Sequence, residues 1–210
     1  MSKIKVFIEG GGQDYSKMFK DQGFEVVGDY KKADLICFTG GADVDPSFYG
    51  EEKHPRTYSN KDRDLKCFEM YGYAIMNGVP MCGICRGSQF LCVANGGRLW
   101  QHVDHHAVGR GHEATTDDGR VISVTSTHHQ MMRPEGVRGQ DYELVLTARE
   151  SVHKEFMQDG KVVSTLATLP DVEGVIWPNT RSFGFQPHPE FRGAPVACTE
   201  FFFEKLQEIL

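Results

Sequence analysis

The chain has 210 residues, of which 40% are hydrophobic, and its formal net charge is −6. This length supports one substantial hydrophobic core and leaves little room for two full domains, so we expect residues 1–210 to form a single domain. The acidic balance provides no overall positive field, which argues against binding to nucleic acid or to an anionic membrane surface and favours a small neutral or zwitterionic substrate.

Neither the start of the chain nor its cysteines indicate secretion. The only apolar run within residues 1–12 spans positions 6–8, which is too short for a signal-peptide core or a membrane span. The six cysteines are scattered, unlike the dense disulfide frameworks of small secreted domains. We therefore expect a cytoplasmic protein with reduced thiols.

In the first half of the chain, short apolar runs alternate with amphipathic stretches, a pattern typical of parallel strands covered by helices. Strands are predicted over residues 4–8, 24–27, 35–38 and 79–84. Helices are predicted over residues 14–22, 61–76 and 86–94, with a structured loop over 42–60.

The second half of the chain is predicted to be richer in antiparallel strands, because its apolar runs are joined by tight turns. Strands are predicted over residues 113–116, 121–125, 143–147, 162–167, 175–177 and 182–186, and a closing helix over 194–210. Together the two halves predict an α/β fold: a flavodoxin-like three-layer sandwich with a mostly parallel central sheet plus additional antiparallel strands.

A candidate nucleophile lies in the segment Gly-Ile-Cys-Arg-Gly at positions 83–87, between a predicted strand and a predicted helix. Small residues on both sides allow a sharp strand-to-helix turn, comparable to the nucleophile elbow of serine hydrolases. At such a turn the positive end of the helix dipole favours the thiolate form of Cys85. Taken alone, the motif is equally compatible with a buried structural cysteine.

A candidate base and its carboxylate partner lie in the segment Gln-Pro-His-Pro-Glu at positions 186–190. A cysteine nucleophile needs a base, and the base needs an acceptor that fixes its tautomer and supports the imidazolium. His188 and Glu190 meet these requirements if the fold brings them to Cys85.

With these two motifs the chain resembles the class I glutamine amidotransferase superfamily. Ser-Gln-Phe-Leu at 88–91 extends the similarity of the nucleophile segment. Further matches at residues 40–44, 46, 49–51 and 63–64 resemble the peptidase C26-type branch of γ-glutamyl hydrolases, which cleave γ-glutamyl-γ-aminobutyrate and related amides.

The resemblance implies roles for individual residues. Cys85, His188 and Glu190 would form the catalytic triad, and the backbone amides of Gly41 and Arg86 would form the oxyanion hole. The implied substrate-binding residues are Gly40, Gln89, Ser126, His128 and Gln130, the last three in a segment where Thr125 replaces the family's usual asparagine.

The implied activity is hydrolysis of γ-glutamyl amide bonds through a glutamyl thioester, with release of glutamate and without a cofactor. A small γ-glutamyl compound is the expected substrate, and a homodimer is compatible with the sequence. Two alternatives stay open: a glutaminase subunit that delivers ammonia to a separate synthetase partner, and a binding protein of the same fold without catalysis.

Two other chemistries compete with this interpretation. Cys82 and Cys85 form a C-x-x-C pair, which is typical of dithiol redox proteins, but the predicted strand would bury Cys82. His102, His105, His106 and His112 crowd one stretch with Asp104, but no further residue completes a familiar tetrahedral spacing. We interpret these histidines as polar loop residues near the mouth of the site and predict no metal site.

Overall fold

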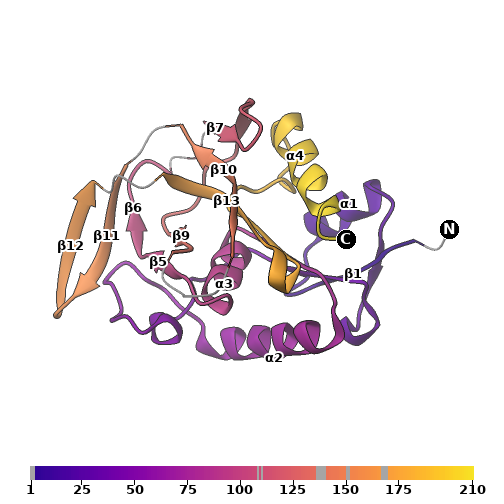
Figure 1. Ribbon diagram of the computed structural model, residues 1–210, viewed down its shortest axis with the longest axis horizontal. Coiled ribbons are helices and arrows are strands. Elements are labelled where there is room, and N and C mark those ends of the chain that lie inside the picture. The colour runs from indigo at the N-terminus through magenta and orange to yellow at the C-terminus, as the bar shows by residue number, and fades with distance from the viewer. Residues whose placement is uncertain (1–2, 108, 110, 136–140, 150–151, 167–169) are drawn as a thin grey trace.

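A nine-stranded sheet forms the centre of the computed structural model, which describes residues 3–107, 109, 111–135, 141–149, 152–166 and 170–210 (Figure 1). The strand order is β2-β1-β3-β4-β14-β13-β10-β7-β8. The first five strands of this order are parallel: β2 (Glu25–Val27), β1 (Lys5–Ile8), β3 (Leu35–Phe38), β4 (Met81–Ile84) and β14 (Ser182–Phe185). The other four are antiparallel: β13 (Asp171–Trp177), β10 (Glu143–Ala148), β7 (His112–Thr116) and β8 (Val121–Val124).

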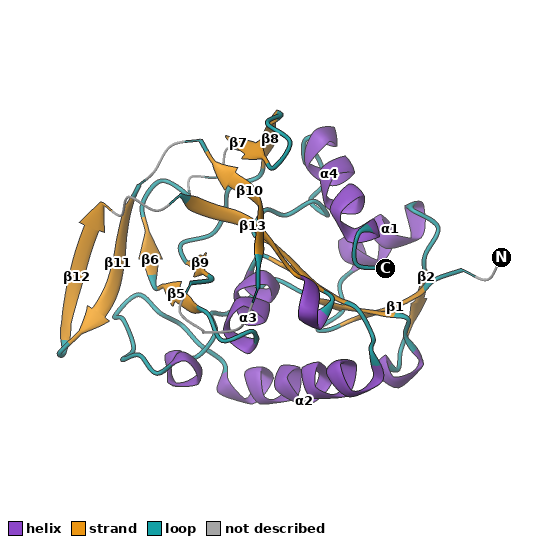
Figure 2. Ribbon diagram, in the orientation of Figure 1, coloured by secondary structure: helices purple, strands orange, loops and turns teal. Residues whose placement is uncertain are grey.

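Helices cover both faces of the parallel part of the sheet, as Figure 2 shows. They are α1 (Gln13–Asp21) and α4 (Val196–Gln207) on one face, and α2 (Lys61–Asn77) and α3 (Arg86–Ala94) on the other. Within the residues that the structure describes, none of the helices combines the length and apolar character needed to cross a membrane.

Two apolar cores separate these layers. Because successive residues of a strand point to opposite faces, Leu35 and Cys37 of β3 join the core beneath α1 and α4, while Ile36 and Phe38 join the core beneath α2 and α3. All four residues are fully buried, which is typical of a parallel strand covered on both sides. The predicted three-layer α/β sandwich is thus confirmed.

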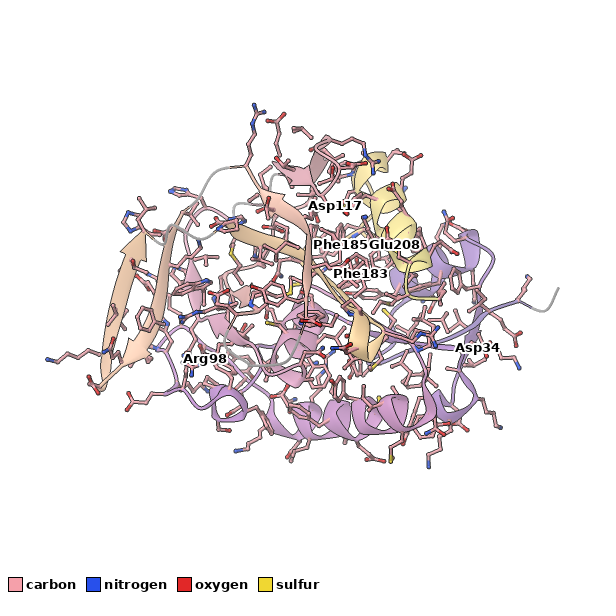
Figure 3. The ribbon with its side chains drawn as sticks, viewed as in Figure 1. Asp34, Arg98, Asp117, Phe183, Phe185 and Glu208 are labelled. Atoms are coloured by element: carbon pink, nitrogen blue, oxygen red, sulfur yellow. The ribbon has the colours of Figure 1, made fainter. Side chains whose placement is uncertain are left out.

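Aromatic side chains join α4 to β14. Phe183 and Phe185 lie in the middle of the molecule beside α4 (Figure 3), and their ring centroids are 5.6 and 5.5 Å from that of Phe202. Phe201 packs against Phe185 as well. This packing fixes the strand that leads directly into the Gln-Pro-His-Pro-Glu segment.

Smaller sheets extend the molecule on one side (Figure 2). One contains β6 (His102–Val103), β11 (His153–Gln158) and β12 (Lys161–Leu166), and the other pairs β5 (Arg98–Trp100) with β9 (Met131–Arg133). The sequence predicted a strand over residues 162–167, and β12 confirms it up to Leu166. Residue 167 lies outside the described residues. The sequence did not predict β5, β6, β9 or β11, because strands of two or three residues and polar strands carry little periodicity.

The strand predicted over residues 175–177 proves longer, since β13 begins at Asp171. Asp171 and Glu173 interrupt the apolar pattern, which made the prediction too short, yet both side chains are fully buried. The single-domain organisation of residues 1–210 stays a prediction.

The topology brings three strand ends together. Strands β3, β4 and β14 are parallel neighbours, so their carboxyl ends meet at one edge of the sheet. This edge is where open α/β sheets bind their ligands. Residues 40–41, Cys85 and residues 186–190 follow these three strands.

Candidate active site

Cys85 occupies the sharp turn between β4 and α3, with a backbone φ of 54° and ψ of −113°. This conformation is unusual for a residue with a side chain, and such strain is characteristic of nucleophile positions. The flanking glycines permit the turn: a Cβ on Gly83 would lie 2.3 Å from the carbonyl oxygen of Gly87, and a Cβ on Gly87 would lie 2.1 Å from that of Phe38. The glycines of the motif are therefore required by close backbone packing.

The structure brings His188 to Cys85 and Glu190. The Nδ1 atom of His188 lies 2.6 Å from Oε1 of Glu190, and all three residues are buried. Burial by itself lowers the pKa of His188, but hydrogen bonding to Cys85 and Glu190 raises it to about 10. The protonated imidazole is therefore the stable form at neutral pH.

Two contacts that the sequence did not suggest fix the position of His188. Thr125 Oγ1 accepts a hydrogen bond from the backbone amide of His188 at 2.6 Å. Phe191 stacks on the imidazole ring, with ring centroids 4.1 Å apart and an angle of 9° between the planes. Thr125, at the position where the resemblance implies an asparagine, thus holds His188 in place.

Arg63 of α2 fixes the loop after β3. Its Nη1 atom donates to the carbonyl oxygen of Gly40 at 3.0 Å, and its Nη2 atom donates to the carboxylate of Glu9 at 2.6 Å. Gly41 has a φ of 138°, and a Cβ there would lie 2.4 Å from Nη1 of Arg63, so only glycine fits at this position. The backbone of Gly40 and Gly41 is thereby held next to the nucleophile.

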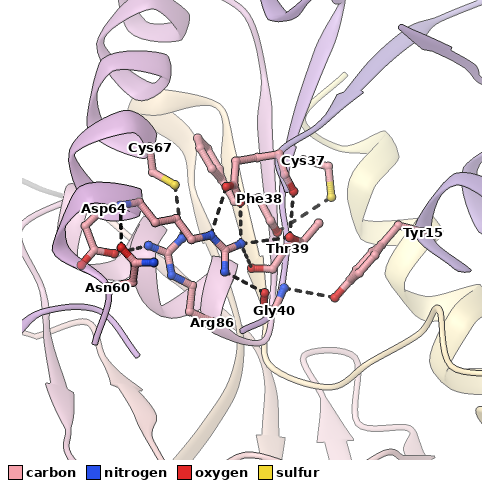
Figure 4. Close-up of polar contacts among 11 residues, drawn as sticks. Tyr15, Cys37, Phe38, Thr39, Gly40, Asn60, Asp64, Cys67 and Arg86 are labelled. Carbon is pink, nitrogen blue, oxygen red and sulfur yellow. Dashed lines mark hydrogen bonds and ion pairs between the residues drawn. The ribbon is translucent and has the colours of Figure 1, made fainter. Parts of the chain in front are cut away.

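The side chain of Arg86 points into the protein interior. Its guanidinium pairs with the buried carboxylate of Asp64 and donates from Nη1 to Sγ of Cys67 at 3.3 Å (Figure 4). As the first residue of α3, Arg86 has a backbone amide without an acceptor inside the helix. Its side chain therefore anchors the elbow, and its amide is available to a ligand.

A cavity of about 220 Å³ lies beside Cys85. It is lined by Gly41, Ala42, Asp43, Tyr58, Cys85, Arg86, Gln89, Thr127, His128, His129 and Gln130. The nucleophile, both implied oxyanion-hole residues and three of the implied substrate-binding residues thus share one cavity. A larger cavity of about 830 Å³, lined by residues such as Glu51 and Trp100, contains none of the triad.

The cavity also contains residues that the sequence analysis missed. Nε2 of His129 lies 3.1 Å from Oδ1 of Asp43, and the backbone amide of Tyr58 donates to Oδ2 of Asp43 at 2.8 Å. Asp43 and His129 belonged to recognised motifs, but only the fold shows that the two motifs face each other.

The implied substrate-binding residues do not all reach the cavity. Gln89 and Gln130 line it, and Nε2 of Gln89 donates to the carbonyl oxygen of Gln130 at 3.2 Å. The hydroxyl of Ser126 instead donates to the carbonyl oxygen of His106 at 2.8 Å, and Ser126 is not among the cavity-lining residues. Gly40 approaches the triad through its backbone, since a Cβ there would lie 3.0 Å from Cε1 of His188.

The C-x-x-C pair has the burial expected of a strand followed by an elbow. Cys82 lies in β4 with no exposed surface, and neither Cys82 nor Cys85 is in a disulfide. A dithiol redox pair requires an exposed attacking thiol, which Cys82 does not provide.

The histidine-rich stretch does not form the cluster suggested by its spacing. His102 pairs with Asp104 at 3.6 Å, and His105 is exposed. His106 is a buried loop residue and His112 is the half-buried first residue of β7, and neither lines the cavity beside Cys85. Both side chains point toward β13 instead, where they contact acidic residues.

Known proteins resemble this chain in sequence and in fold. The Peptidase C26 family model matches residues 24–190. The glutamine amidotransferase-like protein YvdE of Lactococcus lactis is 30% identical over 180 residues, which are 84% of this chain and 72% of the relative. A proposed glutamine amidotransferase of Mycobacterium tuberculosis is 44% identical over 80 residues, or 38% of this chain and 26% of the relative.

The subunit PurQ of phosphoribosylformylglycinamidine synthase from Mycobacterium leprae is 32% identical over 127 residues, which are 56% of this chain and 54% of that protein. The chain thus spans from a quarter to nearly three quarters of the length of these relatives. The crystal structure of a glutamine amidotransferase from Thermotoga maritima superimposes with a TM-score of 0.61, covering 99% of this chain and 86% of that chain at 14% identity. At this identity the match establishes the fold.

Proposed function

Because the chain belongs to the Peptidase C26 family of the class I glutamine amidotransferase superfamily, we propose that it hydrolyses γ-glutamyl amide bonds through a thioester on Cys85. The observation that carries the proposal is the chain of contacts from Cys85 through His188 to Glu190 at the edge of a cavity. It combines a nucleophile, a proton carrier and an orienting carboxylate.

The first step is attack of the Cys85 thiolate on the γ-carbonyl carbon of the substrate. The high pKa of His188, about 10, favours a thiolate–imidazolium pair over the neutral pair. The carbonyl oxygen becomes an oxyanion, and the backbone amides of Gly41 and Arg86 stabilise it. Each such donor contributes about 3 kcal/mol to the transition state.

Collapse of the tetrahedral intermediate breaks the C–N bond, and the His188 imidazolium transfers its proton to the leaving amine. A glutamyl thioester on Cys85 remains. The neutral imidazole then takes a proton from water, and the resulting hydroxide attacks the thioester. Breaking of the C–S bond releases glutamate and regenerates the Cys85 thiolate beside the protonated His188. Glu190 holds the tautomer of His188 through Nδ1.

A small substrate is favoured by the volume of the cavity, about 220 Å³. Gln130 supplies a buried Oε1 atom that makes no hydrogen bond with any of the described residues, and it lines the same cavity. We assign this oxygen as an acceptor for the α-ammonium group of the γ-glutamyl moiety. If the substrates are free γ-glutamyl amines, the enzyme needs no synthetase partner.

Glutamine hydrolysis within a synthetase complex is the second candidate. The similarity to PurQ, a subunit of a synthase, supports this role. In that case the released ammonia would pass to a separate partner subunit. The two candidates share the triad and the thioester, and they differ in the leaving amine.

The test measures glutamate release from glutamine and from a panel of γ-glutamyl amines, using the wild-type protein, Cys85→Ala and the control Cys82→Ala. Cys85→Ala should lose at least about 10³-fold in kcat/KM on every accepted substrate. Cys82→Ala, altered at the buried cysteine of the same motif, should keep the wild-type rate. Activity that persists in Cys85→Ala would refute the proposal, and a preference for glutamine over all γ-glutamyl amines would favour the synthetase-linked role.

A further inference from the structure

A second cluster of polar side chains lies in the interior, around Glu173 of β13. One carboxylate oxygen, Oε1, has three imidazole nitrogens around it: His106 Nδ1 at 3.2 Å, His128 Nε2 at 3.3 Å and His112 Nε2 at 3.4 Å. Glu173, His106 and His128 are at least nine-tenths buried. The catalytic mechanism uses none of the contacts within this cluster.

These contacts are poor hydrogen bonds. Within the part of the chain that the structure describes, the three imidazole nitrogens and both oxygens of Glu173 have no hydrogen-bond partner, although their mutual contacts measure only 3.2–3.4 Å. Buried polar atoms normally have partners, so several unsatisfied atoms facing one another require an explanation. A metal cation that accepts the lone pairs of these atoms would explain why they face one another.

The distances from Glu173 Oε1 to the three imidazole nitrogens match the edge length of a tetrahedral metal site. Zinc binds imidazole nitrogen and carboxylate oxygen at about 2.0–2.2 Å, so the edges of a regular tetrahedron around it measure about 3.3–3.5 Å. The three distances from Glu173 Oε1 are 3.2, 3.3 and 3.4 Å. Donor atoms of His106, His128 and Glu173 all lie within 4.8 Å of one another, and Nε2 of His112 lies 3.4 Å from Oε1 of Glu173 at the edge of this group.

The outer contacts of two histidines leave the inner nitrogens free to coordinate. His128 Nδ1 lies 2.9 Å from the carbonyl oxygen of Gln130, which can only accept, so the proton of a neutral ring lies on Nδ1 and the lone pair on Nε2. His106 Nε2 lies 3.1 Å from Oδ2 of Asp171, which similarly leaves Nδ1 as the coordinating atom. Such outer carbonyl and carboxylate partners are typical of metal-binding histidines.

We propose that His106, His112, His128 and Glu173 form a structural zinc site. Four protein ligands close the coordination sphere, as in structural rather than catalytic zinc sites. A cavity of about 250 Å³, lined by His106 and His112 among others, gives an ion access from the surface. This proposal replaces the sequence-based expectation that the chain binds no metal.

The site joins segments that are distant in sequence. It ties His106, His112 and the segment 126–130 to β13, and the backbone amide of His128 already donates to the carbonyl oxygen of His106 at 3.0 Å. His128 also lines the cavity beside Cys85. The zinc ion would therefore order one wall of the active-site cavity without taking part in the chemistry. This role is independent of which amide the enzyme cleaves.

The alternative is a buried ion-pair cluster in which protonated imidazoles balance Glu173. That cluster would form without any metal, and its histidines would titrate with pH. A zinc site would instead keep all three imidazoles neutral and would bind one ion per chain. The two accounts therefore predict different metal contents.

The test uses the full chain without a histidine tag, purified without chelator. Elemental analysis and native mass spectrometry should find about one zinc per wild-type chain. Glu173→Gln and His106→Ala should lose it, and the control His153→Ala, altered at an exposed histidine, should keep it. Replacement of zinc by Co²⁺ in the wild-type protein should give the intense visible absorption of tetrahedral cobalt.

The thermal stability of the wild-type protein tests the proposal even if the variants fail to fold. Removal of the metal with a strong chelator should lower Tm by about 5 °C or more, and added Zn²⁺ should restore it. Wild-type protein that contains no zinc, gains no thermal stability from added Zn²⁺ and gives no tetrahedral cobalt spectrum would overturn the proposal. Zinc retained in both Glu173→Gln and His106→Ala would also overturn it.

Discussion

The hydroxyl oxygen of Tyr15 accepts a hydrogen bond from the backbone amide of Gly40 at 3.1 Å (Figure 4). Burial and the negative charge of Glu190 raise the pKa of Tyr15 well above its ordinary value, so the hydroxyl keeps its proton beside the Glu190 carboxylate. One side chain from α1 therefore contacts the loop that precedes the implied oxyanion hole and is an electrostatic neighbour of Glu190, the carboxylate of the proposed triad.

Replacing Tyr15 with phenylalanine should lower kcat/KM about 10-fold, because the hydrogen bond that positions Gly40 is lost. Steady-state kinetics of the variant measures this effect. Tyr73→Phe is the matched control, because the hydroxyl of Tyr73 donates to the carbonyl oxygen of Lys31, away from the proposed triad. Equal rates for Tyr15→Phe and the wild-type protein would rule out a positioning role.

A methyl group at Gly40 should disturb the triad while the fold persists. The Cβ of Gly40→Ala would lie 3.0 Å from Cε1 of His188 and 3.1 Å from the hydroxyl of Tyr15. Displacing the imidazole by a few tenths of an ångström up to 1 Å should reduce kcat up to about 100-fold. Gly72→Ala, which meets no atom within 4 Å, should retain full activity. Kinetics and circular dichroism of both variants test the prediction, and an unimpaired Gly40→Ala enzyme would contradict it.

The protonation of His188 should be observable directly. Its pKa of about 10 lies above the ordinary value of 6.5, so protonation of His188 stabilises the folded state below about pH 6.5, and this contribution is lost as the pH rises through about 10. An NMR titration of the imidazole should show the raised pKa in the wild-type protein. In Cys85→Ala the pKa should fall, because the hydrogen bond to Cys85 is removed. A wild-type value near 6.5 would exclude the ion pair.

The buried pair of Asp64 and Arg86 should be important for stability. Neither side chain is exposed by more than 1%, and removal of one partner leaves the other charge buried without compensation. Asp64→Ala should lower the free energy of unfolding by about 3–5 kcal/mol. Asp62→Ala, at an exposed position of the same helix turn, should lower it by less than about 1 kcal/mol. Urea denaturation of both variants checks the difference.

The sequence pattern was most informative where local geometry alone dictates the residues. The apolar strands β1, β3 and β4 and the helices between them follow from short-range periodicity, and the glycines around Cys85 follow from the sharpness of one turn. The predicted strand boundaries were wrong where charged side chains are buried. Asp171 and Glu173 lie inside β13, although two carboxylates within three residues normally indicate a surface.

By itself, the sequence determined the α/β layering, the elbow at Cys85 and the His-Pro-Glu segment, because these depend on contacts between residues a few positions apart. Only the tertiary structure decided that Tyr15 and Thr125 hold the triad, and that His128 faces Glu173 as well as the cavity. Those partners are separated by tens of residues along the chain. No local pattern encodes such pairs, since it is the packing of strands and loops in three dimensions that brings them together.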